Sequence, residues 1–180
     1  MHRILSILVP IMFLATVVAS GQSEKPEKAD IVLKAALQQA KGGNKTVLLV
    51  FHASWCGWCK RLDAVLEDPD IKKIMNDHYV ITHLDVMESG AKKALENPGG
   101  NEMIAEYGGA KSGLPFYSFL NSDGKKIADS NVMPKDQNIG YPGTPEEIAA
   151  FNILLKQTAP RMTDEQRSQI VAYLQKNAPR

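Results

Sequence analysis

The sequence is poor in cysteine. Cysteine occurs only twice in 180 residues, at Cys56 and Cys59, whereas small scaffolds that depend on disulfides use several widely spaced cysteines. Two cysteines three positions apart close so short a loop that their disulfide would stabilise the folded chain little. A closed zinc site needs four ligands, and the four histidines are scattered along the chain. A structural staple and a closed zinc site are therefore poor explanations of the pair.

The sequence also lacks an excess of either charge. It has 21 Lys and Arg residues against 20 Asp and Glu residues, a formal net charge of +1, and no basic block of the kind that follows a nucleic-acid backbone. Nucleic acid is therefore not expected as a partner. The length suits one domain rather than two, and no internal repeat or low-complexity tract divides the chain.

The N-terminus holds a long uncharged stretch. A basic residue, Arg3, precedes an apolar run over residues 4–18, which ends in small residues. This pattern is typical of a secretory signal peptide. We expect a signal peptide over residues 1–21, with cleavage after Ala19 or after Gly21. If the host is a bacterium, the protein is then expected in the periplasm or outside the cell.

An uncleaved membrane anchor is the alternative to a signal peptide. The uncharged stretch over residues 4–23 is just long enough to span a bilayer, and membrane attachment is expected only in that case. A lipid anchor through cysteine is excluded, because no cysteine lies near the cleavage region. The polar residues 22–28 are expected to form a flexible lead, and residues 29–180 a single domain.

The periodicity of apolar residues predicts an α/β domain. Apolar residues at helical spacing predict helices, and short runs rich in β-branched and aromatic residues predict strands. In chain order, the expected elements are a helix after Asp30, a strand over 46–51, a helix from Cys56, a helical piece over 71–75, a strand over 79–86, a short helix over 101–107 and strands over 116–120 and 125–129. A parallel pair of strands followed by an antiparallel hairpin accommodates this order.

Two loops and a helical extension complete the prediction. Residues 88–100 are rich in small and polar residues and are expected to be an irregular loop with at most some helix. Residues 130–143 contain two prolines and two glycines and are expected to be either a long surface loop or a partly ordered flap. Thr144 and Thr163 are each followed three residues later by Glu or Gln, which is the signature of a capping box. Two helices are therefore expected in a C-terminal extension over residues 144–177.

The position of the cysteines predicts reactive thiols. Cys56 follows a predicted buried strand and begins a predicted helix, whose N–H groups and dipole stabilise an anion. Such a site lowers a thiol pKa from about 8.5 to between roughly 3.5 and 7.5, and His52 and Lys60 are candidate modulators of that pKa. Cys59 lies one turn further and can reach the sulfur of Cys56. We expect Cys56 to attack a disulfide and Cys59 to resolve the mixed disulfide.

Two segments resemble the thioredoxin superfamily. The stretch Phe51-His52-Ala53-Ser54-Trp55-Cys56-Gly57-Trp58-Cys59-Lys60 is similar to the active-site segment of that family, and Gly113-Leu114-Pro115 resembles its cis-proline loop. The resemblance covers about residues 32–129. It implies a thioredoxin fold, a central mixed β-sheet flanked by helices, here with an extra C-terminal helix.

The resemblance also implies roles for residues around the cysteines. Pro115 is the implied cis residue, and the backbone of Leu114 is implied to pair with an extended substrate. Trp55, Gly57 and Trp58 are expected to contact the substrate as well.

The implied activity is that of an exported thiol–disulfide oxidoreductase. It would reduce or isomerise protein disulfides and need no cofactor beyond the Cys56–Cys59 couple. Because space outside the cytosol is oxidising, a reductase there needs an electron donor, expected to be another dithiol protein. Two alternatives stay open: a copper-delivery protein, since thiolates suit Cu(I), and a non-catalytic binding domain with an incidental disulfide.

The sequence departs from the family pattern in three ways. Thioredoxins usually carry a buried aspartate, the implied proton acceptor for the second cysteine, where this chain has Val50. Trp58 stands where thioredoxin often has proline, so the reduction potential cannot be carried over. Residues 88–100, residues 130–143 and the last helix exceed a minimal thioredoxin, and we expect substrate choice to depend on them.

Overall fold

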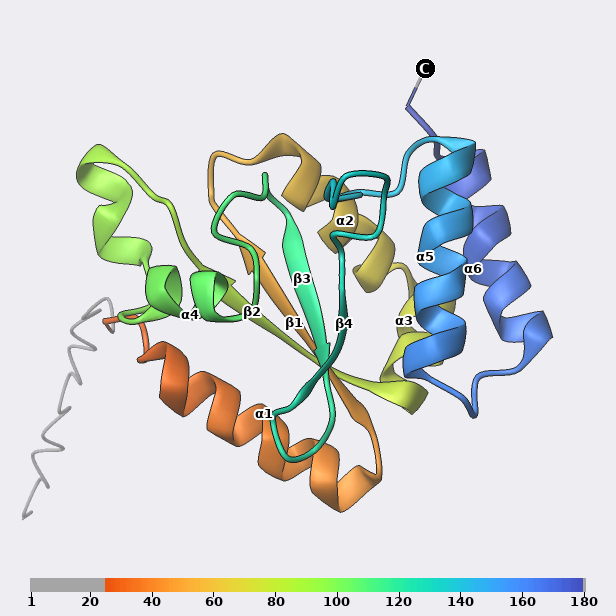
Figure 1. Cartoon of the computed structure of the whole chain (residues 1–180), viewed down its shortest axis with the longest axis horizontal. Helices are drawn as coiled ribbons and strands as arrows, with labels where there is room; N and C mark the ends of the chain where they lie inside the picture. The colour runs from red at the N-terminus through yellow and green to blue at the C-terminus, as the bar shows by residue number, and fades with distance from the viewer. Residues whose placement is uncertain (1–24, 180) are drawn as a thin grey trace, which may run out of the picture.

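The structure is a computed structural model that describes residues 25–179. The predicted signal peptide and the start of the predicted lead lie outside the described residues. In chain order the elements are α1 (Ala29–Gly43), β1 (Thr46–His52), α2 (Gly57–Glu67), α3 (Pro69–His78), β2 (Tyr79–Asp85), the 3₁₀ helix η1 (Gly90–Leu95), α4 (Gly100–Glu106), β3 (Phe116–Leu120), β4 (Lys126–Asp129), α5 (Pro145–Thr158) and α6 (Asp164–Lys176) (Figure 1).

The four strands form one mixed sheet in the order β2-β1-β3-β4. β1 and β2 run parallel, with Thr46 opposite Tyr79 and His52 opposite Asp85. Parallel neighbours need a long crossover, and α2 and α3 supply it. β3 runs antiparallel to both β1 and β4. The predicted parallel pair followed by an antiparallel hairpin is therefore confirmed.

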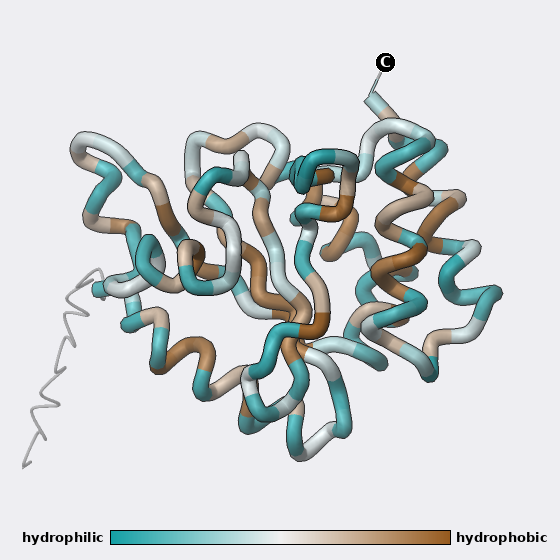
Figure 2. Tube along the Cα trace, viewed as in Figure 1, coloured by the Kyte–Doolittle hydropathy of each residue, from teal (hydrophilic) through white to brown (hydrophobic). Residues whose placement is uncertain are grey.

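The sheet is covered by helices on both faces. Alternate residues of β1 face opposite sides, so Leu49 and Phe51 pack with α1 and α4, whereas Leu48 and Val50 pack with α2, α3, α5 and α6. A strand buried on both faces reads as a continuous apolar run, which is how residues 46–51 appear in the sequence. Hydrophobic residues line the sheet and the inner helix faces, and hydrophilic ones the outside (Figure 2).

Local capping determines where several helices begin. The Asp68 side chain accepts hydrogen bonds from the backbone N–H groups of Asp70 and Ile71, and Pro69 opens α3, so the crossover is two helices, as predicted. Thr144 and Thr163 both form the predicted capping boxes. The C-terminal extension is therefore a pair of contacting helices, α5 and α6, beside the sheet (Figure 1).

The structure corrects some predicted boundaries and adds a contact in the lead. Lys125 and Val86 lie just outside the strands, although each still makes one backbone hydrogen bond to the neighbouring strand end: the Val86 N–H donates to the His52 carbonyl and the Asn121 N–H to the Lys125 carbonyl, both at 2.9 Å. The segment over 88–100 contains η1 and is otherwise irregular. The Glu27 carbonyl in the predicted lead accepts a hydrogen bond from Nδ2 of Asn97 at 2.8 Å, which ties the chain to the domain there.

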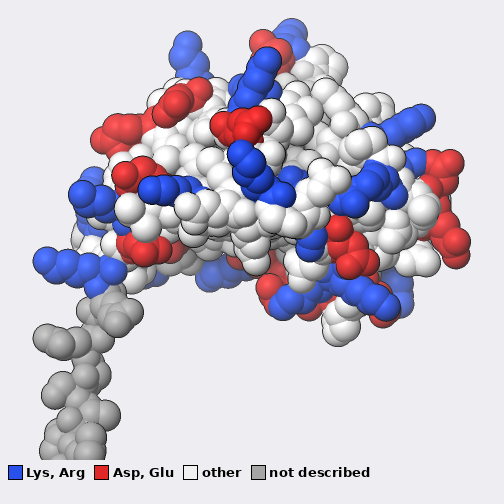
Figure 3. Space-filling model, turned by 90° about the horizontal axis from the view of Figure 1, so that it is seen from below, with Lys and Arg blue, Asp and Glu red and all other residues white. Residues whose placement is uncertain are grey.

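The surface charge agrees with the near-zero net charge of the sequence. Lys and Arg are interspersed with Asp and Glu on the face drawn in Figure 3, with no block of one sign. None of the helices within residues 25–179 is long and apolar enough to cross a membrane.

Replacing a capping residue should destabilise the C-terminal helix pair. Thr163 Oγ1 accepts from the Gln166 N–H at 3.2 Å, and Gln166 Oε1 accepts from the Thr163 N–H at 2.9 Å. Thr163→Ala is expected to lower the free energy of unfolding by about 1 kcal/mol, measured by urea denaturation. Thr163→Ser keeps the hydroxyl and is the matched control. An equal loss in both variants would show that the cap is not the cause.

Candidate active site

The two cysteines form a disulfide at the start of α2. Their Cα atoms are 5.3 Å apart. Cys56 is the N-cap residue: its backbone is extended, and its Sγ accepts a hydrogen bond from the Cys59 N–H at 3.1 Å. The sulfur of Cys56 therefore occupies the place where a helix N-terminus stabilises an anion, as the sequence predicts.

The disulfide is recessed between two exposed tryptophans. Cys56 is 4% exposed and Cys59 1%, whereas Trp55 and Trp58 are 55% and 51% exposed. The Trp55 Nε1–H donates to the Met87 carbonyl at 2.9 Å. These rings give the recessed sulfurs an apolar border that a partner chain can contact.

Trp58 is held by its own neighbours. Its ring stacks on Tyr141 with centroids 6.0 Å apart, and the Arg61 guanidinium lies 5.4 Å from its centre. The sequence places Trp58 outward, and the structure agrees. Gly57, also predicted to contact substrate, is exposed beside it.

A cis-proline loop lies against the disulfide. The Leu114–Pro115 peptide bond is cis and precedes β3, as the resemblance implies. Leu114 packs against the small buried cluster that Ala53 forms with the two cysteines. The side chain of Asn138 holds this loop from the segment 130–143, since its Nδ2 donates to the carbonyls of Gly113 at 2.7 Å and Pro115 at 2.9 Å.

A groove runs from Trp58 past the cis-proline loop. It has a volume of about 1160 Å³, and residues 135–141 form much of its wall. Backbone hydrogen bonds hold that wall in place. The Ile139 N–H donates to the Ser130 carbonyl, and Met133 and Gln137 each donate to the carbonyl of the other. Of the two forms expected for residues 130–143, a surface loop and a partly ordered flap, the structure therefore shows the flap.

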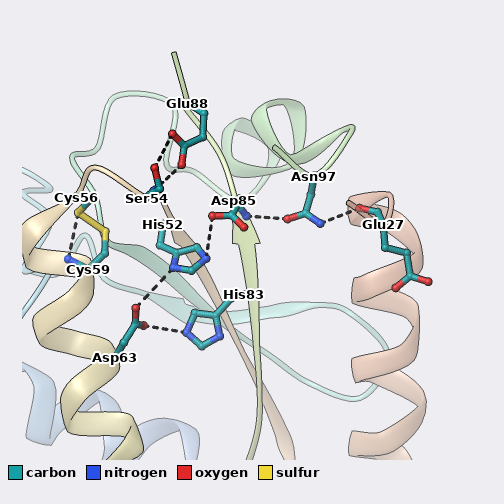
Figure 4. A network of polar contacts seen from close by, with 10 residues as sticks. All are labelled: Glu27, His52, Ser54, Cys56, Cys59, Asp63, His83, Asp85, Glu88 and Asn97. Carbon is teal, nitrogen blue, oxygen red and sulfur yellow. Dashed lines mark hydrogen bonds and ion pairs between the residues drawn. A yellow bond between two sulfur atoms is a disulfide. The ribbon is translucent and has the colours of Figure 1, made fainter. Parts of the chain in front are cut away.

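Four titratable side chains contact one another between α2 and the ends of strands β1 and β2. His52 comes from β1, His83 and Asp85 from β2 and Asp63 from α2 (Figure 4). His52 Nδ1 lies 3.8 Å from the Asp63 carboxylate, and His52 Nε2 lies 3.4 Å from that of Asp85. His83 Nε2 is 3.2 Å from the other Asp63 oxygen. We call these four residues the His–Asp cluster.

The cluster shifts the pKa values of its members. Burial alone would lower the pKa of His52, but the carboxylates of Asp63, Asp85 and Glu88 outweigh burial and raise this pKa above its ordinary value of 6.5. Burial would raise the pKa of Asp63, but contacts with the imidazoles of His52 and His83 hold it well below its ordinary 3.8. Asp63 is therefore a carboxylate at neutral pH.

A buried glutamate holds the loop that precedes Cys56. Glu88 is 5% exposed. Its carboxylate accepts from the Ser54 N–H at 2.5 Å and from the Ser54 hydroxyl at 3.0 Å, and its own N–H donates to Glu96 at 2.9 Å. The segment 88–100 is thereby fastened to the active-site loop.

Five residues of this site were not predicted from the sequence. Asp63, His83, Asp85, Glu88 and Asn138 carry no motif, and each meets its partner only through tertiary structure. The one available signal was the placement of Asp63 four residues after Cys59, hence on the same face of the helix. Of the predicted pKa modulators, His52 belongs to the cluster, whereas Lys60 is exposed.

The fold and the site define a thioredoxin-type arrangement: a disulfide at a helix N-terminus after the central strand, facing a cis-proline before the next antiparallel strand. Residues 29–122 match the thioredoxin-like family, and the chain belongs to that family.

Two relatives named for disulfide exchange are similar in sequence to this part of the chain. Protein disulfide-isomerase tigA of Aspergillus niger is 31% identical over 113 residues, which are 56% of this chain and 32% of the relative. Thiol:disulfide interchange protein DsbD of Photorhabdus laumondii is 28% identical over 93 residues, 51% of this chain and 14% of the relative. The chain thus spans a third or less of the length of these relatives.

A solved structure is also similar. The crystal structure of a disulphide isomerase from Xylella fastidiosa Temecula1 has 24% identity, covers 83% of this chain and 90% of its own, and gives a TM-score of 0.49. The fold assignment depends on the family match and the strand order rather than on this score.

Removing the Glu88 carboxylate should loosen the active-site loop. Glu88→Ala leaves the Ser54 N–H without its charged acceptor, and a loss of about 1.5–3 kcal/mol in the free energy of unfolding is expected. Denaturation of the oxidised protein in urea measures it. Glu88→Gln keeps a carbonyl acceptor and should lose less. Equal stability of Glu88→Ala and the unchanged protein would contradict this account.

Proposed function

We propose that the protein is an exported thiol–disulfide oxidoreductase that reduces or isomerises protein disulfides through the Cys56–Cys59 couple. The observation that carries this proposal is the position of the disulfide: Cys56 caps α2, and Leu114 of the cis-proline loop packs against the cluster that contains both cysteines. A structural disulfide needs neither feature.

The exchange follows from the different positions of the two thiols. In the reduced protein, the N-terminus of α2 stabilises the Cys56 thiolate. This thiolate attacks one sulfur of a substrate disulfide, forms a mixed disulfide and releases the other sulfur as a thiol. Cys59 then attacks Cys56, so that the substrate gains two electrons and two protons while the enzyme becomes the observed disulfide.

The groove supports an extended protein substrate. None of the backbone hydrogen bonds among residues 25–179 uses Leu114, so its peptide groups are available to pair with a chain. Trp55, Gly57 and Trp58 then border the bound cystine. The flap over 130–143 forms the opposite wall, and substrate choice is assigned to it.

Export and the electron donor are part of the same proposal. The apolar run behind Arg3 supports export, and the likeness to DsbD, whose name describes thiol:disulfide interchange, supports a partner that exchanges thiols. A reductase in an oxidising compartment must be recharged by another dithiol protein.

The reduction potential of the couple tests the direction of electron flow. A value near the thioredoxin end, about −270 mV, is expected for a reductase, whereas about −120 mV is the value of a disulfide donor. Trp55 and Trp58 adjoin the disulfide, so their fluorescence can follow the equilibrium with glutathione. A potential near the upper value would overturn the reducing direction and leave the exchange chemistry intact.

Removing the resolving thiol should trap substrates. Cys59→Ser keeps the Cys56 nucleophile but cannot complete the cycle, so mixed disulfides with proteins of the host compartment should accumulate. Non-reducing electrophoresis followed by reduction detects them. Cys56→Ser is the matched control and should trap far fewer. A reactive Cys56 that accumulates no mixed disulfide would refute the two-cysteine cycle on protein substrates.

A further inference from the structure

The resolving thiol needs a proton acceptor. Cys59 attacks only as a thiolate, yet it is 1% exposed in the oxidised protein, and it is the third residue of α2, whereas Cys56 occupies the N-cap position that favours an anion. Val50, fully buried on β1 toward α2, offers no titratable group. The acceptor is then either water or another side chain.

Asp63 brings the His–Asp cluster to the side of α2 that carries Cys59. Residues four apart on a helix are neighbours on one face, about 6 Å apart along the axis. The Asp63 carboxylate contacts both imidazoles of the cluster. Figure 4 shows these imidazoles between α2 and strand β2, on the side of α2 that bears Asp63. His52 therefore contacts α2 at Asp63, one helical turn after the resolving thiol.

The cluster also reaches the surface. Its four side chains are between 23% and 37% exposed, whereas Cys59 is nearly inaccessible. A proton taken from the thiol can therefore pass to solvent through a side chain that is itself only half buried.

We propose that His52, oriented by Asp63, accepts the proton of Cys59 when the mixed disulfide is resolved. This inference rests on the proposed thiol–disulfide exchange. His52 is the acceptor, and Asp63 is a positioning residue that holds the imidazole and stabilises the imidazolium. His83 acts on Asp63 from the opposite side, and Asp85 contacts the second nitrogen of His52.

The choice of His52 over Asp63 follows from basicity. An ordinary cysteine thiol has a pKa of about 8.5, and proton transfer is most efficient to a base whose pKa is close to neutral. The pKa of His52 is raised above 6.5, whereas that of Asp63 is held below 3.8. Whatever the pKa of the Cys59 thiol, proton transfer to the imidazole is therefore less uphill than transfer to the carboxylate.

The step balances in atoms and electrons. Neutral His52 takes the thiol proton and becomes the imidazolium, and the Cys59 thiolate attacks the Cys56 sulfur of the mixed disulfide. The Cys56–Cys59 bond forms as the Cys56–substrate bond breaks, and the electron pair leaves on the substrate sulfur. That sulfur takes a proton from His52 or solvent, and no other reactant is needed.

The pH dependence follows from the groups that face His52. These are Asp63 from α2, His83 and Asp85 from β2, and Glu88 from the segment after β2. Below the pKa of His52 the imidazole already carries a proton and cannot accept another. Resolution should therefore quicken as pH rises through a midpoint above 6.5. Removing the Asp63 charge should lower that midpoint, since a carboxylate that raises the pKa of His52 is lost.

Reaction of the reduced protein with Ellman's reagent, a small aromatic disulfide, separates the two steps. Attack by Cys56 releases a first coloured thiolate, and resolution by Cys59 releases a second. His52→Gln is expected to slow the second phase by about 100-fold near neutral pH and leave the first within a few-fold. The second phase of this variant should recover at alkaline pH, where Cys59 ionises without help. Asp63→Asn should slow the second phase less and shift its midpoint downward.

A second histidine supplies the matched control. His78, at the end of α3, contacts Gln166 at 3.2 Å and lies outside the cluster, so His78→Gln should change neither phase. An unchanged second phase in His52→Gln would overturn the proposal, as would equal slowing of both phases. Slowing in Asp63→Asn alone would transfer the role to Asp63 and overturn the assignment of His52. Absence of the first phase in the unchanged protein would instead refute the proposed exchange function.

Discussion

The burial of strand β1 is the constraint on which the rest of the structure depends. β1 is paired on both edges and covered on both faces. A shift of one residue would turn each apolar side chain to the opposite face, so its register is held firmly. Because β1 cannot slide, the turn after it places Cys56 at the start of α2, and the last pair of the parallel ladder sets His52 opposite Asp85.

One helix then gives its two cysteines different surroundings. The first turn of α2 presents unpaired N–H groups and the positive end of the dipole to Cys56. One turn beyond Cys59, the same helix presents the Asp63 carboxylate, which contacts two imidazoles. The first environment favours a thiolate at rest, and the second is the one to which we assign removal of the Cys59 proton. A two-step exchange needs this order, since the attacking thiol must ionise first.

The additions to the family core are joined to the active site by single side chains. Glu88 links the segment 88–100 to Ser54, just before Cys56, and Asn138 links the flap over 130–143 to both sides of the cis-proline. Both are bonds to the loops that hold the sulfurs. Binding of a partner that moves either segment would therefore change the geometry around the disulfide. A segment without such bonds to the active-site loops could not have this effect.

The sequence by itself determined whatever depends on near neighbours along the chain. Apolar periodicity, the two threonine capping boxes and the Cys-x-x-Cys spacing act within one helical turn or one strand, so they predicted most elements, the buried central strand and the start of α2 at the cysteines. Tertiary structure alone decided which distant side chains meet. Asp63 reaches His52 and His83 only because α2 packs across β1 and β2 in one register, and Glu88 and Asn138 lie 34 and 23 residues from their partners Ser54 and Pro115. Such contacts depend on packing rather than local propensity, and for that reason no short pattern encodes them.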